Sequence, residues 1–263
     1  MDLGINGKIA FVAGGSQGMG AAAASILAAE GCRVAVVARN QERIDHAVER
    51  IRSAGGMAIG ISADLSTTVG ITAAVEGVRS AFGPPEIVVA QTNDLTTGNF
   101  FDLTDEDFRR VFQIFTVSFA ALARAVIPDM RAAGWGRIVH IGSAIAKEPQ
   151  RDLAHVLHNT IRSSTTSLVK SLADEFARDG VTINSVAPGY IMTDTMRRYF
   201  EEKYGVADDS VAEWVQSTRG IPAERHGTPE EIGSTVAFLC SRQAGYITGE
   251  WILVDGGWHR SAV

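Results

Sequence analysis

Two histidines and an arginine in the segment 155–162 have the residue types and the spacing for proton chemistry. His158 lies three residues after His155 and four before Arg162, so a helix through this segment places all three on one face. Imidazole exchanges protons near neutral pH, but a neighbouring guanidinium should lower the pKa of His158. A neutral imidazole can still donate its N–H to a carbonyl oxygen. The alternatives are that His158 is a tolerated polar neighbour of a pocket and that His155 lies on the helix surface.

A glycine-rich segment near the start of the chain has the composition of a phosphate-binding loop. Residues 13–20 read AGGSQGMG, between an apolar strand-like run and an Ala-rich helix. Glycines let the backbone approach a pyrophosphate, whose charge the amides of a helix N-terminus favour. Glycines also serve turns for purely conformational reasons, but this position between strand and helix favours a dinucleotide site.

The end of the second predicted strand discriminates between the two nicotinamide dinucleotides. An acidic residue there would bind the ribose hydroxyls, whereas this chain has Ala38-Arg39-Asn40. Arg39 could pair with a 2′-phosphate or could be a solvated residue at a helix start; we expect NADP(H) rather than NAD(H). Asp64 is placed either to meet the adenine edge or to cap the next helix.

Apolar strand-like runs alternate with amphipathic segments along the whole chain. The strands are predicted at residues 9–13, 33–38, 57–61, 87–90, 137–141, 181–186 and 251–254. The helices are predicted near residues 18–30, 41–54, 67–81, 104–132, 153–178 and 228–240. The strands are apolar on consecutive residues, which is typical of a sheet covered on both faces. The pattern predicts an α/β fold with a doubly wound parallel sheet in a single domain, residues 1–263.

Composition excludes several classes of function. The chain has 263 residues and a formal charge of −6, which argues against a surface that binds nucleic acid. Cys32 and Cys240 are far apart in apolar surroundings, so we expect reduced thiols and neither a disulfide nor a metal site. No secretory signal and no apolar stretch long enough for a bilayer stand out, and we expect a cytoplasmic protein without a membrane partner.

The sequence resembles the short-chain dehydrogenase/reductase family over nearly its whole length. The resemblance rests on the glycine motif, with Ala13 where Thr is usual, and on five further segments: GRIVHIGS (136–143), NSVAPG (184–189), GTPEEI (227–232), YITG (246–249) and VDGG (254–257). It implies a Rossmann-type fold, a small-molecule substrate, and a homodimer or homotetramer formed through the helices that contain Phe115 and Leu168. The cofactor-binding residues predicted from these motifs are Gly14, Ser16, Gln17, Gly18, Met19, Gly20, Arg39, Asp64, Leu65, Gln91, Arg162, Pro188, Gly189, Ile191 and Thr193.

The resemblance also implies a catalytic set, from which this chain departs. Members of the family use Ser to polarise the carbonyl, Tyr as proton donor, Lys to hold the nicotinamide ribose and Asn to anchor a water relay. Ser143 matches, but His158 stands at the Tyr position, Arg162 at the Lys position and Phe115 at the Asn position. We predict Ser143, His158 and Arg162 as the catalytic residues, with Tyr190 as a second-ranked proton donor. Phe115 belongs to a helical stripe that is more often core or subunit interface.

Three functions follow from this pattern. The first is an NADPH-dependent carbonyl reductase in which His158 or water supplies the proton. The second is non-redox chemistry on the same fold, such as isomerisation, cyclisation, dehydration or dehalogenation, and the third is a catalytically silent nucleotide-binding subunit. The aromatic residues of a lid-like segment, about 191–221, suit a bulky or ring-bearing substrate, although ordinary helix packing also explains them.

Overall fold

The computed structural model describes residues 2–149, 154–206, 210, 213–215, 217 and 220–260, and its centre is a seven-stranded parallel sheet. The strands are β1 (Ile9–Ala13), β2 (Arg33–Ala38), β3 (Met57–Ser62), β4 (Ile87–Ala90), β5 (Gly136–Ile141), β6 (Val181–Pro188) and β7 (Trp251–Val254). Their order in the sheet is β3-β2-β1-β4-β5-β6-β7. All seven predicted strands are present, and the expected doubly wound Rossmann-type fold is confirmed.

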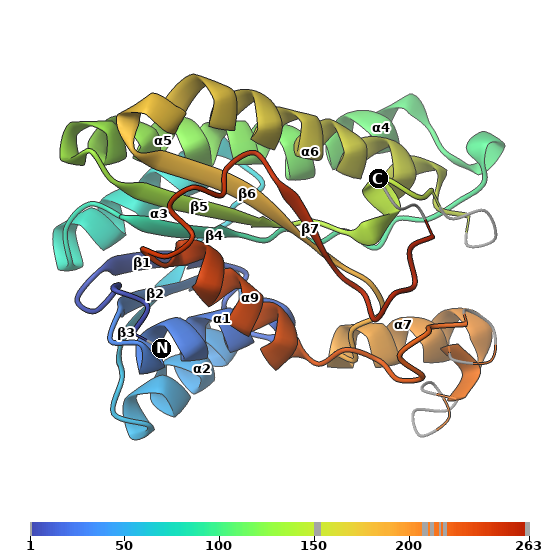
Figure 1. Cartoon of the computed structure of the whole chain (residues 1–263). Coiled ribbons are helices and arrows are strands. Elements are labelled where there is room, and N and C mark those ends of the chain that lie inside the picture. Colours follow the sequence, from blue (N-terminus) through green and yellow to red (C-terminus); the bar gives the residue numbers. More distant parts are fainter. Residues whose placement is uncertain are drawn as a thin grey trace.

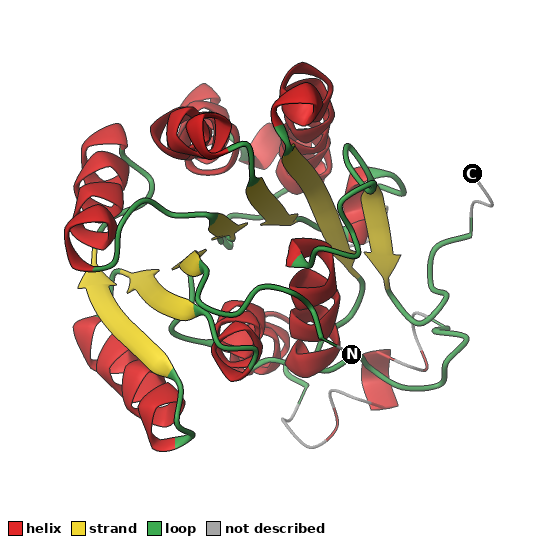
Figure 2. Cartoon of the chain, turned by 60° about the vertical axis from the view of Figure 1, so that its left-hand side comes forward, coloured by secondary structure: helices red, strands yellow, loops and turns green. Residues whose placement is uncertain are grey.

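Helices cover both faces of the sheet (Figures 1 and 2). One face carries α1 (Gly18–Ala29), α2 (Gln41–Ser53) and α9 (Pro229–Cys240), which lie below the sheet in Figure 1. The other face carries α3 (Thr68–Ala81), α4 (Asp105–Phe112), α5 (Ser118–Ala133) and α6 (Val156–Phe176). Helix α7 (Asp194–Tyr204) lies apart from both layers, beyond the end of β7.

The core forms two layers because side chains alternate between the faces of each strand. Val12 of β1 packs in the layer under α1 and α9, whereas its neighbour Phe11 packs in the layer under α3 and α5. Both side chains are fully buried. Burial on both faces explains why these strands are apolar on consecutive residues.

The helix predicted over residues 104–132 is interrupted. A π-helical stretch, Gln113–Val117, separates α4 from α5 and contains Phe115. A π-helical turn of this kind is wider than an α-helical one and is frequent at functional sites.

By length and composition the run Asp105–Ala133 could span a membrane. However, 56% of its most apolar window is buried inside the protein, so it is a core helix.

The strand order reverses between β1 and β4, which are hydrogen-bonded neighbours although β1 also pairs with β2. The loops after these two strands therefore diverge to opposite faces and leave a crevice at the carboxyl edge of the sheet. This crevice is where the sequence motifs converge.

Candidate active site

A cavity of about 820 Å³ opens at the carboxyl edge of the sheet. It is lined by residues that follow β1, β2, β3, β4, β5 and β6, and by α6, α7 and Trp258. All but one of the residues predicted to bind cofactor or to act in catalysis line this cavity. The volume lies in the range of small-molecule and cofactor sites.

The glycine loop forms one wall of the cavity. Gly14 and Gly18 have φ angles of 66° and 55°, a conformation that glycine adopts without steric cost. Helix α1 begins directly after the loop, and Gln17 at its N-cap makes no hydrogen bond that caps the helix. The first amides of α1 are thus left for an external acceptor, as a pyrophosphate site requires.

Gly20 is the predicted residue that does not line the cavity. A Cβ at this position would lie 2.4 Å from the carbonyl oxygen of Gly14 and 2.7 Å from Oε1 of Gln91. The prediction of direct cofactor contact by Gly20 is therefore replaced by a packing role. Its lack of a side chain lets helix α1 approach the loop that contains Gly14.

Two arginines line the cavity where β2 ends. Arg39 is exposed there, and Arg43, one turn into α2, donates from Nη1 to Oε1 of Gln17 at 2.7 Å. Arg39 was among the residues predicted to bind cofactor, whereas Arg43 was not. The available signal for Arg43 was its position four residues after Arg39, at the start of a helix.

Asp64 lines the same end of the cavity and does not cap the following helix. Its Oδ1 accepts from the backbone N and the hydroxyl of Ser66, at 3.0 and 2.7 Å. These hydrogen bonds hold the pKa of Asp64 below its ordinary value. The cap of α3 is Thr67, which accepts from Gly70 N, so the alternative of Asp64 as a helix cap is wrong.

Pro188, Gly189, Ile191 and Thr193 line the opposite wall, after β6. Thr193 accepts a hydrogen bond from Met196 N and caps α7, and its Cγ2 would lie 3.5 Å from a Cβ added at Gly18. The start of α7 therefore lies against the glycine loop.

Ser143 follows β5 by two residues and is half-buried at the cavity wall. Its Oγ accepts a long hydrogen bond of 3.5 Å from Ile145 N, which leaves the hydroxyl proton for another acceptor. A carbonyl oxygen of a bound substrate is such an acceptor.

Arg162 extends from α6 across the floor of the cavity. Its Nη1 donates to the carbonyl oxygen of Gly142 at 3.1 Å, and its guanidinium lies 4.9 Å from the ring centre of Phe115. Burial lowers the pKa of Arg162 to about 10, and no carboxylate among the described residues pairs with it. The aromatic face of Phe115 thus supports the charge where a water-binding side chain was expected.

His158 is only 4% exposed and lines the cavity. Its ring stands edge-on to Phe115, with ring centres 5.9 Å apart. Burial lowers its pKa to about 3, with smaller contributions in the same direction from Arg162 and His155. His158 is therefore neutral at physiological pH, as predicted, and its Nδ1 is buried without a hydrogen-bond partner in the described structure.

His155 does not lie on the helix surface, contrary to one interpretation of the sequence. It precedes α6, lines the cavity, and has its ring centre 5.7 Å from that of His158 and 6.4 Å from that of Tyr199. The periodic pattern missed this because His155 stands at the beginning of α6, where the chain enters from a loop.

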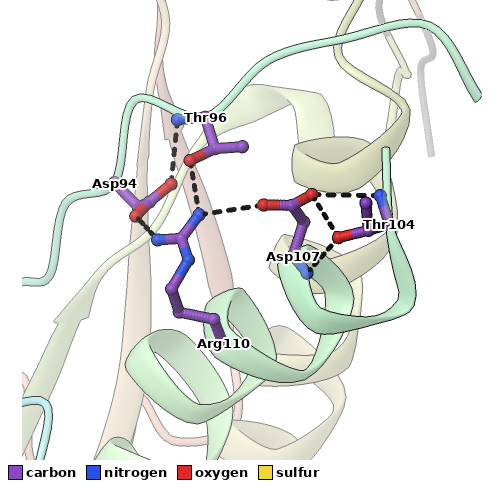
Figure 3. A network of polar contacts seen from close by, with 5 residues as sticks. All are labelled: Asp94, Thr96, Thr104, Asp107 and Arg110. Carbon is purple, nitrogen blue, oxygen red and sulfur yellow. Dashed lines mark hydrogen bonds and ion pairs between the residues drawn. The ribbon is translucent and has the colours of Figure 1, made fainter. Parts of the chain in front are cut away.

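The loop between β4 and α4 contributes an ion-pair network that the sequence analysis did not identify (Figure 3). Arg110 Nη1 donates to Asp94 at 2.6 Å and Nη2 donates to the hydroxyl of Thr96 at 2.6 Å. Asp94 also accepts from Thr96 N at 2.8 Å. The spacing Asp-x-Thr, typical of a side chain that closes a turn on itself, was the available signal.

Aromatic side chains close the far end of the cavity. Tyr190, Tyr199, Phe200 and Trp258 line it, and the rings of Tyr190 and Trp258 meet edge to face at 5.7 Å. Tyr190 is buried against Trp258, a residue near the C-terminus that sequence reasoning passed over. Gly256 and Gly257, both at positive φ, form the turn that precedes Trp258.

Comparison with known proteins agrees with this geometry. The Enoyl-(Acyl carrier protein) reductase family matches residues 13–259. Among curated proteins, the short-chain reductase protein NovJ of Streptomyces niveus is 33% identical over 95% of this chain and 93% of its own. The 3-oxoacyl-[acyl-carrier-protein] reductase FabG of Escherichia coli is 32% identical over 97% of this chain and 98% of its own.

Solved structures give the same result. L-sorbose reductase from Gluconobacter frateurii, complexed with NADPH and L-sorbose, superimposes with a TM-score of 0.92 at 30% identity, covering 99% of this chain and 100% of that one. YwfH, an NADPH-dependent reductase involved in bacilysin biosynthesis, superimposes with a TM-score of 0.90 at 26% identity, covering 97% and 100%.

Proposed function

The chain belongs to the short-chain dehydrogenase/reductase family of NAD(P)H-dependent oxidoreductases, and we propose that it is an NADPH-dependent reductase of cyclic or aromatic ketones. The observation that supports the proposal is that Ser143, His158 and Arg162 share one cavity with the glycine loop. A hydride donor and the groups that bind a carbonyl oxygen would thus meet in one site.

The residues present fit an NADP(H) molecule. The amides at the uncapped start of α1 would donate hydrogen bonds to the pyrophosphate. Arg39 and Arg43 would pair with the 2′-phosphate, and Asp64 would contact the adenine. Arg162 would donate to the nicotinamide ribose hydroxyls. Of the relatives named above, L-sorbose reductase is complexed with NADPH and YwfH is an NADPH-dependent reductase, which supports the same preference.

The proposed chemistry divides between the cofactor and the chain. When bound, the nicotinamide supplies the hydride. Ser143 orients and polarises the carbonyl oxygen, and His158 donates a proton to that oxygen. Arg162 adds a fixed positive charge close to the developing negative charge.

The substrate class follows from the far end of the cavity. Tyr190, Tyr199, Phe200 and Trp258 present ring faces and edges, and Met196 supplies an adaptable apolar contact. A flat, ring-bearing ketone would contact these groups better than a short polar one. We further propose that the segment 191–221, of which residues 207–209, 211, 212, 216, 218 and 219 lie outside the described residues, acts as a lid. We also propose that the protein is cytoplasmic and that it assembles as a homodimer or homotetramer through the helical segments that contain Phe115 and Leu168.

Turnover of a ketone panel tests the proposal directly. Purified protein is mixed with NADPH and with 1-tetralone, acetophenone or cyclohexanone, and NADPH oxidation is followed by absorbance with product identified by chromatography. We expect faster turnover of the ring-fused ketone than of cyclohexanone, and weaker activity with NADH. Tight NADPH binding without oxidation by any ketone, or product formation in cofactor-free protein, would contradict the proposal.

A further inference from the structure

Two histidines at the start of α6, His155 and His158, both line the cavity and differ in their exposure to solvent. His155 is partly exposed at the wall, whereas His158 is almost completely buried, and their ring centres are 5.7 Å apart with an angle of 49° between the planes. We propose that His155 relays protons from solvent to His158 during ketone reduction. This inference rests on the proposed function and adds a residue to it.

His158 requires such a partner because it is neutral in the folded protein. A neutral imidazole that gives its N–H proton to an oxygen would become an anion unless its second nitrogen gains a proton in the same event. The usual charged donor is excluded, since burial holds the pKa of His158 near 3. Arg162 cannot supply the proton, because a guanidinium remains charged even with its pKa lowered to about 10.

The proton transfer balances with His155 in place. The carbonyl carbon gains a hydride, the two π electrons of the C=O bond move to oxygen, and this oxygen takes a proton from one ring nitrogen of His158. The other ring nitrogen of His158 takes a proton from His155 through one water molecule, because no hydrogen bond joins the two rings in the described structure, and His155 takes a proton from solvent. NADPH is oxidised to NADP⁺, the ketone is reduced to an alcohol, and both histidines return to their starting charge.

The backbone around His155 is held in place from two sides. Ala154, directly before it, has a φ of 51°, a left-handed conformation that is unfavourable for alanine. Gly98 N donates to the carbonyl oxygen of Ala154 at 2.9 Å, and Gly98 forms a bridge with His155. The chain thus keeps a strained residue next to the proposed relay, and a loop from a different part of the sequence fixes it.

That loop is itself anchored by the network in Figure 3. Asp94 and Thr96 both bind Arg110 of α4, which fixes the loop four residues before Gly98. Asp94 is also the negative charge that faces His158, and the backbone of Thr96 lies within hydrogen-bond reach of that imidazole. Among the described residues, the groups that face the pair include Arg162 from α6, Asp94 from the β4–α4 loop, Phe115 from the π-helical stretch and Tyr199 from α7.

The experiment compares His155→Gln and His155→Ala with the wild-type protein, using 1-tetralone and NADPH. We expect kcat to fall by about a hundredfold, which is the lower end of the range for a general acid–base contribution. The dissociation constant of NADPH, measured by fluorescence in the absence of ketone, should stay within about twofold, because proton transfer plays no part in binding. The matched control is His46→Gln, a change of an exposed histidine on α2, which should leave kcat unchanged.

Two further measurements separate a relay from a structural role. Added imidazole should restore part of kcat in His155→Ala, and the proton inventory of the wild-type protein in mixed H₂O and D₂O should be curved, since two protons move together. An unchanged kcat in His155→Gln, or a loss that imidazole does not restore, overturns the proposal. If the variants fail to fold, a linear inventory in the wild-type protein overturns it as well. Failure of the proposed function looks different, because the wild-type protein itself would then not oxidise NADPH with any ketone.

Discussion

The cavity has two halves that differ in how their linings are built. The half around α1 and α2 relies on backbone conformation and on exposed charges: glycines at positive φ, an uncapped helix start, and Arg39 and Arg43 at the surface. The half around α6 relies on buried polar side chains, with His158 and Arg162 both shifted in pKa by burial. The first half contains the glycine motif on which the family resemblance rests, whereas the second contains His158, Arg162 and Phe115 at the positions where that resemblance leads one to expect Tyr, Lys and Asn.

The difference shows which features of a site can change independently. A glycine that allows close approach of two backbone segments has no substitute, because any Cβ would collide. A proton donor can be replaced if the surrounding charges suit the replacement, and here Phe115 and Arg162 are in direct contact. We therefore expect these two residues of the α6 half to act as a unit.

Acid should separate the two halves most strongly, because His158 of the α6 half is a buried imidazole, and His140 of β5, outside the cavity, is a second one. His158 and His140 both have their pKa lowered to about 3, from an ordinary 6.5, mainly by burial. Each is neutral when folded and gains a proton on unfolding, so the free energy of unfolding is highest above pH 6.5 and decreases as the pH falls towards 3. Between pH 6.5 and 5 the loss should be roughly 2 kcal/mol for each imidazole.

Thermal unfolding between pH 7.5 and 5 measures this effect, before most carboxylates titrate. The variant His158→Gln should lose about half of the pH dependence that comes from the two buried imidazoles, and His46→Gln, at an exposed histidine of α2, is the substitution control. An unfolding temperature independent of pH over this window would show that His158 is solvated in the folded protein.

The second prediction concerns Ser143, which lines the cavity after β5. Ser143→Ala should reduce kcat by about a hundredfold to a thousandfold, the effect of removing one preorganised donor to a developing oxyanion. NADPH affinity should be nearly unchanged, because the hydroxyl faces the reacting carbonyl. Steady-state rates and fluorescence titration measure the two quantities, and Ser167→Ala, an exposed serine on the outer side of α6, is the matched control.

The sequence predicted the fold, and it also predicted most of the α1-half residues that line the cavity, for the same physical reason. Glycine spacing, strand periodicity and the residue at the end of β2 depend on neighbours along the chain, and these are visible in the sequence. The exception is Gly20, whose role depends on its contact with Gly14 and Gln91 across two loops.

The α6 half was predicted only in part. The sequence placed His158 and Arg162 on one face of a helix, but it could not show that Phe115 stacks on Arg162 or that Gly98 holds Ala154. These contacts join residues far apart in the chain, and the network of Asp94 with Arg110 depends on how a loop folds back onto α4. Trp258 reaches the cavity only because β7 ends beside β6.

The third prediction tests whether Gly20 of the α1 half has a packing role. Gly20→Ala should lower the free energy of unfolding by about 1–3 kcal/mol, as overpacking of a tight interior does, because the new Cβ would meet a carbonyl oxygen that cannot move aside. NADPH affinity should fall as the loop shifts. Gly77→Ala in α3 is the control, since its Cβ would meet only the end of the Ile61 side chain, at 3.1 Å. Equal stability of the two variants would contradict the packing role of Gly20.

The fourth prediction tests the charges of the α1 half. Arg39→Ala combined with Arg43→Ala should weaken NADPH binding by about tenfold or more, as the loss of hydrogen bonds to a charged group implies, and should leave NADH binding nearly unchanged. The discrimination between the two cofactors would then largely disappear. Arg109→Ala, an exposed arginine of α4 outside the cavity, is the control. Equal weakening for both cofactors would indicate that the arginines bind the pyrophosphate.

The smallest expected effect is the coupling free energy between Phe115 and Arg162. Its measurement tests whether these two residues of the α6 half act as a unit. The ring face lies 4.9 Å from the guanidinium, and a desolvated contact of this kind contributes about 0.5–2 kcal/mol. Phe115→Asn alone should destabilise the protein because it leaves a buried charge without that support, and Arg162→Lys alone loses the planar group that fits the ring. The double variant should be less destabilised than the sum of the two single variants, and a double-mutant cycle of unfolding free energies measures the difference. Strict additivity of the two unfolding free-energy changes would mean that the two residues act independently. Adding His158→Tyr to the double variant then tests whether the catalytic set implied by the family resemblance can operate in this cavity. The rate and the pH profile of ketone reduction measure the outcome.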